Sequence, residues 1–202
     1  MTKAIIFDLW GTLLHNGVKP SPNKQIKSIL GLEKMDFSEF IFIFEEAFMT
    51  QKNPSMENEF KKVCKTFLVK PEKELIDKMV KVWKENKSFA KPFPETIEVL
   101  DGLKKKYKLI LLSNTDGFLI QKILKKYDME KYFEQIVLSC NIGMLKPNPD
   151  IFKLILEKNK LKKEEVVMVG DSMISDIEGA KEVGIKGILI DLDNPEKYEL
   201  IK

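Results

Sequence analysis

Acidic, hydroxyl, amide and amino side chains stand at four distant points of this sequence, each directly after or shortly beyond a short apolar run. They are Asp8, Ser113 with Asn114, Lys146, and Asp171 with Asp176. Three carboxylates brought together would repel one another unless a cation lay among them. Their all-oxygen set of ligands indicates a hard ion, for which Mg²⁺ is the first choice.

The same side chains suit the transfer of a phosphoryl group. Lys146 would supply a positive charge and Ser113 a hydrogen-bond donor for the phosphoryl oxygens. One carboxylate must then act as the nucleophile, and Asp8 is the natural choice. It would form an aspartyl-phosphate that water later cleaves.

Asp8 follows residues 5–7, a β-branched and aromatic run that suits a strand buried on both faces. Gly11 and Thr12 come next and have the composition of a tight turn whose backbone N–H groups can face an anion. The alternative interpretation is that Asp8 only caps this turn. The motif alone does not decide between the two, so the rest of the chain must.

From residue 93 onward, strand and helix patterns alternate. Strands are predicted at 108–112, 135–138, 166–169 and 187–190, and helices near 95–105, 117–126, 150–158 and 176–183. This alternation predicts a parallel sheet with helices on both faces. The carboxyl ends of parallel strands share one edge of a sheet, so the polar side chains can converge there.

Between residues 21 and 86 the pattern is helical throughout. Ser21, Asp36 and Ser55 have the character of capping residues at the starts of three helices, and a fourth helix carries Trp83 on its apolar stripe. The run 40–44 also fits a strand, but the capping residues and the length favour a helix. We therefore predict an α/β core domain of residues 1–16 and 89–202, interrupted by a helical domain of residues 17–88.

The composition is that of an ordinary soluble protein, with 44% hydrophobic and 32% charged residues and a net charge of +3. That charge offers no strong field for nucleic acid. All the basic residues are Lys, so the chain has no planar, bidentate anion clamp. Cys64 and Cys140 fit no metal spacing and indicate a reduced, cytoplasmic protein. The apolar run 40–44 is too short to span a membrane, and nothing in the sequence indicates an oligomeric state.

Four segments, in this order, resemble the motifs of the haloacid dehalogenase (HAD) superfamily. They are FDLWGT (7–12), LLSNT (111–115), KPNPDIF (146–152) and VGDSMISD (169–176). The helical insert is similar to the type-1 cap of that family. The resemblance implies a Rossmann-like, three-layer α/β core, a Mg²⁺ cofactor and a small phosphorylated substrate.

The resemblance also assigns a role to each motif residue. Asp8 is the nucleophile, and Lys146 is the second catalytic residue. The substrate is held by Gly11, Thr12, Ser113, Asn114 and Lys146. The metal is held by the side chains of Asp8, Asp171 and Asp176 and by the backbone carbonyl of Trp10.

Trp10 departs from the pattern of the family phosphatases. By the resemblance, their first motif is usually D-x-D-G-T, and its second Asp acts as general acid and base; Trp10 stands at that position. General acid catalysis contributes about 10²–10⁴-fold in rate, so we expect an enzyme restricted to good leaving groups such as acyl or aryl phosphates. His15, the only histidine, could replace the acid, although a solvated linker residue is the simpler interpretation. Asp116 is interpreted as the cap of the next helix.

Two alternatives rank below the phosphatase. A metal-free, dehalogenase-like hydrolase would explain the aromatic residue at position 10, but family dehalogenases use a cap arginine and lack the acidic pair formed here by Asp171 and Asp176. A non-catalytic protein that binds a phosphorylated ligand or a partner would explain the missing acid, yet it would have little reason to keep carboxylates that need a cation to coexist. In all three, Phe40, Phe44 and Trp83 indicate an apolar lid at most, because the aromatic residues of the helical insert are more often core than ligand site.

Overall fold

A computed structural model describes residues 1–51 and 55–192 of the chain, so residues 52–54 and 193–202 of the two predicted domains lie outside the described residues. At its centre is a five-stranded, entirely parallel sheet with the strand order β5-β4-β1-β6-β7. Its strands are β1 (Ala4–Phe7), β4 (Lys108–Ser113), β5 (Gln135–Leu138), β6 (Val166–Gly170) and β7 (Lys186–Leu189). The predicted α/β class with a parallel sheet is confirmed.

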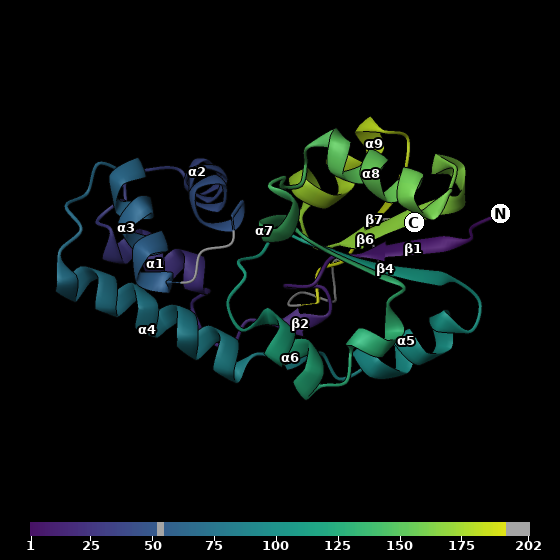
Figure 1. Cartoon of the computed structure of the whole chain (residues 1–202), viewed down its shortest axis with the longest axis horizontal. Helices are drawn as coiled ribbons and strands as arrows, with labels where there is room; N and C mark the ends of the chain where they lie inside the picture. Colours follow the sequence, from purple (N-terminus) through teal and green to yellow (C-terminus); the bar gives the residue numbers. More distant parts are fainter. Residues whose placement is uncertain (52–54, 193–202) are drawn as a thin grey trace.

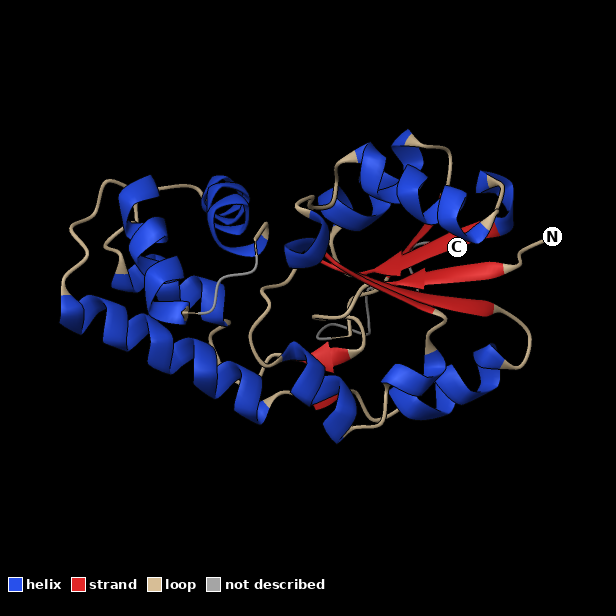
Figure 2. Ribbon diagram, viewed as in Figure 1, coloured by secondary structure: helices blue, strands red, loops and turns tan. Residues whose placement is uncertain are grey.

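The two faces of the sheet are covered by different helices (Figure 2). Ile5 and Phe7 of β1 pack on the side of α5 (Thr96–Lys104) and α6 (Ile120–Lys126). Ala4 and Ile6 pack on the side of α8 (Pro149–Asn159) and α9 (Gly179–Glu182). Because successive side chains of a strand point to opposite faces, an uninterrupted apolar strand is what a sheet covered on both sides requires.

A separate group of four helices lies beyond the carboxyl edge of the sheet (Figure 1). These helices are α1 (Pro22–Ile29), α2 (Phe37–Met49), α3 (Met56–Thr66) and α4 (Lys73–Phe89). We call them the helical unit. Its hydrophobic core is its own, with Phe40, Phe44, Phe48, Phe60 and Trp83 at the centre.

Local capping explains where two of these helices begin. The carboxylate of Asp36 accepts hydrogen bonds from the backbone N–H groups of Ser38 (2.8 Å) and Glu39 (3.1 Å), and the hydroxyl of Ser55 accepts one from Asn58. Such contacts satisfy donors that a helix start leaves free, so the run 40–44 is helical as predicted. Ser21 precedes α1 but makes no capping hydrogen bond through its side chain.

The two chain crossings between sheet and helical unit lie side by side. They form a short antiparallel ribbon of β2 (Leu14–His15) and β3 (Lys91–Pro92). The hydroxyl of Thr96 donates to the carbonyl of Leu13 (3.0 Å), which ties the outgoing and returning segments together. This ribbon was not predicted, because two-residue strands are too short to show an alternating pattern.

Three further short elements differ from the predicted helices. The chain forms a one-turn helix α7 (Ser139–Ile142) and two 3₁₀ turns, η1 (Glu130–Tyr132) and η2 (Lys163–Glu165). Helix α6 begins at Ile120 rather than near 117, because Asp116 bonds the N–H of Phe118 and Leu119 has a left-handed φ of 60°.

The last predicted helix, 176–183, is instead a π-helical turn η3 (Met173–Glu178) followed by α9. The carbonyl of Ser172 accepts hydrogen bonds from the N–H groups of both Asp176 and Ile177. This wider turn places Asp176 inside the element rather than at its start. Throughout the described residues, none of the helices has the length and apolar character needed to cross a membrane.

The contribution of Phe48 to the hydrophobic core of the helical unit can be tested. It is 1% exposed and packs against Phe44, Phe60 and Trp83, whereas Phe42 on the same helix is 68% exposed. We expect Phe48→Ala to lower the free energy of unfolding by about 3–5 kcal/mol, as truncation of a buried Phe does. Urea denaturation followed by circular dichroism measures this, with Phe42→Ala as the matched control. Equal midpoints for the two variants would contradict the assignment.

Candidate active site

The polar site lies at the carboxyl edge of the sheet, where the chain changes direction. Strand β1 lies between β4 and β6, and after β5 the chain crosses to the opposite side of β1. Ligands of open α/β sheets bind at such switch points. A cavity of about 380 Å³ lies there, lined by the sheet edge on one side and by α1, α2 and α4 of the helical unit on the other.

Three carboxylates meet at the floor of this cavity. Asp8 directly follows β1, Asp171 directly follows β6, and Asp176 lies in η3. One oxygen from each lies within 4.8 Å of the others. Asp8 and Asp176 are buried, whereas Asp171 is exposed. The structure therefore brings together the three acidic residues predicted from distant motifs.

Two glycines allow this close approach. A Cβ atom at Gly170 would lie 2.2 Å from Oδ2 of Asp176, and one at Gly11 would lie 2.2 Å from Oδ2 of Asp171. Gly11 also has a φ of +80°, in the left-handed region that favours glycine. Gly11 thus leaves the space that the carboxylate of Asp171 occupies, because it has no Cβ atom.

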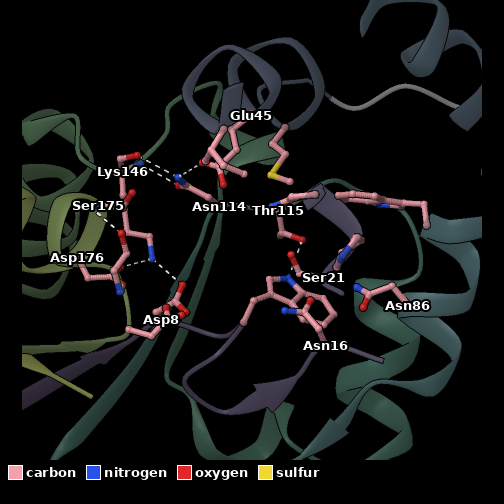
Figure 3. Close-up of a pocket in the computed structure, with 18 of the residues that line it drawn as sticks. Asp8, Asn16, Ser21, Glu45, Asn86, Asn114, Thr115, Lys146, Ser175 and Asp176 are labelled. Atoms are coloured by element: carbon pink, nitrogen blue, oxygen red, sulfur yellow. Dashed lines mark hydrogen bonds and ion pairs between the residues drawn. The ribbon is translucent and has the colours of Figure 1, made fainter. Parts of the chain in front are cut away.

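Lys146 lies between two of the carboxylates (Figure 3). Its Nζ donates to Oδ1 of Asp8 and to Oδ1 of Asp176, each at 2.6 Å, and the side chain is 2% exposed. The backbone N–H of Lys146 donates to Oδ1 of Asn114 (2.8 Å), while Nδ2 of Asn114 donates to the carbonyl of Lys146 (2.9 Å). Asn114, which was predicted to bind the substrate, therefore also holds Lys146 in place.

Desolvation and repulsion between carboxylates raise the pKa values of Asp8 and Asp171. Burial raises the pKa of Asp8 to about 6, although Lys146 opposes this. Although part of the Asp171 side chain is exposed, desolvation by the surrounding protein, followed by the charges of Asp8 and Asp176, raises the pKa of Asp171 to about 8. The two carboxylates hold the pKa of Lys146 above its usual range in spite of burial. One ammonium therefore faces three carboxylates, and further positive charge would be stabilising.

The residues at the cluster fit a hard divalent cation. Among the described residues, Oδ2 of Asp8 is buried with no hydrogen-bond partner, and the same is true of the hydroxyls of Thr12 and Ser113. Buried polar atoms are usually satisfied, so a carboxylate oxygen and two hydroxyls without protein partners indicate a ligand. The oxygen-only donor set is of the kind that Mg²⁺ prefers.

Trp10 forms part of the cavity wall and supports a buried ion pair. The ammonium of Lys87, at the end of α4, lies 4.2 Å from the centre of the Trp10 ring. It pairs with Asp116 at 3.1 Å, and the indole N–H of Trp83 donates to the same carboxylate at 2.8 Å. Asp116 therefore accepts a hydrogen bond within the turn at Phe118 and joins the helical unit to the sheet, but it does not cap α6 as predicted, because that helix begins at Ile120 without a side-chain cap.

Glu45 is a cavity residue that the sequence did not reveal. It lies on α2, and its Oε2 accepts a hydrogen bond of 2.8 Å from Nδ2 of Asn114. Burial raises the pKa of Glu45 to about 7, with Asn114 and Lys146 opposing the shift. The available signal was its position four residues after Ile41, since both residues share one face of a helix and both line the cavity.

Comparison with known proteins identifies the family. A model described as haloacid dehalogenase-like hydrolase matches residues 2–184. The chain belongs to the haloacid dehalogenase-like hydrolase family. Its sequence is 31% identical to the glyceraldehyde 3-phosphate phosphatase of Methanocaldococcus jannaschii over 209 residues, which cover 97% of this chain and 90% of that protein. The chain is thus a hydrolase.

Two further relatives agree with this assignment. The glyceraldehyde 3-phosphate phosphatase of Methanothermobacter thermautotrophicus is 29% identical over 97% of this chain and 88% of its own length. A HAD family enzyme from Bacteroides thetaiotaomicron, solved in complex with magnesium and inorganic phosphate, is 26% identical with a TM-score of 0.64, covering 94% of each chain. The predicted membership of the HAD family is confirmed.

Two interpretations of the HAD cavity can be compared with the structure. Phe40 and Phe44 do not form an apolar lid, because both are fully buried in the core of the helical unit, and only Trp83 of the three predicted lid residues lines the cavity. His15 does not belong to the described lining of the cavity. Its ring packs against Phe93 with the centroids 3.6 Å apart.

Asp171 predicts an unusual pH dependence of stability. Its pKa is raised to about 8 in the folded protein and lies near 4 in an unfolded chain, so the folded state binds the proton more tightly. The free energy of unfolding should then fall as the pH rises from about 4 to about 8. In Asp171→Asn this fall should be smaller, as measured by urea denaturation at pH 5 and pH 8 with a chelator present.

Asp101→Asn is the control, because Asp101 is an exposed carboxylate on α5. It should follow the wild-type protein at both pH values. If Asp171→Asn also follows the wild-type protein, the raised pKa of Asp171 does not contribute to the pH dependence of the free energy of unfolding.

Proposed function

We propose that this protein is a Mg²⁺-dependent phosphatase that hydrolyses a small phosphorylated metabolite through an aspartyl-phosphate at Asp8. The observation that carries the proposal is the cluster of Asp8, Asp171 and Asp176, in which Asp8 and Asp176 both bind the buried Lys146. The relatives that are named phosphatases support the same reaction class.

In the proposed site, Mg²⁺ would be held by the carboxylates of Asp8, Asp171 and Asp176 and by the backbone carbonyl of Trp10. The chemistry supplied by a bound Mg²⁺ is neutralisation of charge on the phosphoryl oxygens. Within the protein, Oδ1 of Asp8 is fixed by Lys146, while Oδ2 has no partner among the described residues. An oxygen of Asp8 attacks phosphorus, and the bond from phosphorus to the leaving oxygen breaks.

The phosphoryl group would be steadied by the nearby donors. Lys146 supplies positive charge beside Asp8, and the buried hydroxyls of Thr12 and Ser113 supply hydrogen bonds that they do not make to described residues. The N–H groups of the turn at Gly11 suit an anion as well. Water then attacks phosphorus of the aspartyl-phosphate, which releases inorganic phosphate and restores Asp8.

We further propose that the helical domain of residues 17–88 acts as a cap that selects the substrate. Its helices supply Phe37, Ile41 and Trp83 to the same cavity that holds Asp8. Four polar residues also line this cavity and suit a substrate with hydroxyl or carbonyl groups. They are Asn16, Ser21, Asn23 and Asn86. A cavity of about 380 Å³ fits a small metabolite.

A panel of substrates tests the reaction class. We expect phosphate release from small phosphate esters with Mg²⁺ and its loss in a chelator, because three carboxylates need a cation to bind a phosphate. Asp8→Asn should lower activity by at least about 10³-fold, since it removes the nucleophile. Phosphate and halide release are measured for each substrate, including a 2-haloacid.

Exposed Asp101→Asn is again the matched control and should keep wild-type activity, because it lies on α5 away from the cavity. Halide release that persists in the chelator would favour the dehalogenase-like alternative. Phosphatase activity that survives Asp8→Asn would show that the activity does not come from this site.

A further inference from the structure

Glu45 stands apart from the other acidic residues of the cavity. The described lining contains four carboxylates, and three of them form the cluster of Asp8, Asp171 and Asp176. The fourth, Glu45, comes from the opposite wall, on helix α2 of the helical unit. The proposed mechanism leaves this residue without a task.

A short chain of hydrogen bonds fixes the position of Glu45 relative to the nucleophile (Figure 3). Oε2 of Glu45 accepts from Nδ2 of Asn114 (2.8 Å). Asn114 is itself held by two hydrogen bonds to the backbone of Lys146, and Nζ of Lys146 binds Asp8 (2.6 Å). A carboxylate from the helical unit is thereby positioned against the reacting edge of the sheet.

The surroundings of Glu45 raise the pKa of its carboxyl group. Burial raises its pKa to about 7, the carboxylates of Asp8 and Asp176 act in the same direction, and Asn114 and Lys146 oppose it. The other charged groups that line the cavity are Asp171 on the sheet side and Lys87 on α4. Lys87 is paired with Asp116, so it is already neutralised within the wall.

Trp10 cannot act as the general acid and base of the site. Its indole N–H can donate a hydrogen bond but cannot give up and recover a proton at neutral pH. In the structure, that N–H is directed to the hydroxyl of Thr115 at 3.4 Å. An enzyme that protonates a poor leaving group and activates water at this site therefore needs another side chain for those two steps.

We propose that Glu45 is the catalytic acid and base of this enzyme, supplied by the helical unit in place of the acid missing at Trp10. The inference rests on the proposed phosphatase function and adds a residue to it. It also removes the expected restriction to good leaving groups, since that expectation depended on the cavity having no acid.

The proton balance follows in two steps. As an oxygen of Asp8 bonds to phosphorus, the bond to the leaving oxygen breaks and the Glu45 carboxyl gives its proton to that oxygen, which departs as an alcohol. Glu45 is then a carboxylate. In the second step it takes a proton from the attacking water as the phosphorus–Asp8 bond breaks, so that inorganic phosphate leaves and both residues return to their starting states.

Glu45→Gln tests this role with little structural change, because the amide oxygen can still accept from Asn114. With Mg²⁺ saturating, kcat/KM for glycerol 3-phosphate should fall about 10²–10⁴-fold, the usual contribution of general acid catalysis. For p-nitrophenyl phosphate, kcat/KM should fall less than about tenfold, because that leaving group needs no proton in the transition state. Loss of the base should slow the second step and give a burst of one p-nitrophenol per enzyme.

Glu46→Gln is the matched control, since Glu46 is the next residue of α2 and is exposed; it should keep wild-type kinetics for both substrates. Glu45→Asp keeps the carboxyl group and should recover part of the glycerol 3-phosphate activity. Thermal unfolding of each variant checks that the fold is retained.

Three results would overturn the proposal. An equal loss of kcat/KM for both substrates would show that Glu45 only positions Asn114 and Lys146. A higher Mg²⁺ requirement with unchanged rates at saturation would make Glu45 a metal ligand, and wild-type kinetics would leave it without a role. If Asp8→Asn is inactive in any of these cases, the phosphatase proposal survives; if Asp8→Asn stays active, the proposed function itself fails.

Discussion

The structure depends on holding three like charges together at one edge of a parallel sheet. Strands β1 and β6 are neighbours, with Phe7 opposite Val169, so the residues that follow them emerge side by side. Asp8 and Asp171 are therefore forced together by the hydrogen-bonded register of the apolar strands. The buried Lys146 offsets only part of this repulsion. The hydrophobic core must stabilise a site that is electrostatically unfavourable until it binds positive charge.

The helical unit makes polar contacts with this edge of the sheet. Its contacts with the sheet include a part-buried polar contact from Glu45 to Asn114 and buried ones from Lys87 and Trp83 to Asp116. Buried polar groups must find their partners, so these contacts fix how the unit sits over the cavity more specifically than apolar packing would. In the proposed function, the groups that would bind phosphate and the groups that would contact the rest of a substrate thus come from different parts of the fold.

Much of the fold could be predicted because its signals are local. Four uninterrupted apolar runs after the helical insert, and capping residues such as Asp36 and Ser55, depend on neighbours within a few positions. The β2–β3 ribbon and the π-helical turn at Asp176 could not be predicted, since the first joins segments far apart in sequence. The second depends on a shared carbonyl at Ser172, which leaves no compositional signal.

The sequence by itself determined which residues stand at the ends of the strands. Asp8, Lys146, Asp171 and Asp176 could be selected because each follows a buried strand or a recognisable motif, and parallel strands end at one edge. Only the tertiary structure decided what faces them. Glu45 and Lys87 belong to helices whose amphipathic patterns show which side is apolar, but helical periodicity carries no information about which distant strand end a helix will cover. That pairing arises from packing the helical unit over the sheet, and it places Glu45 opposite Asp8.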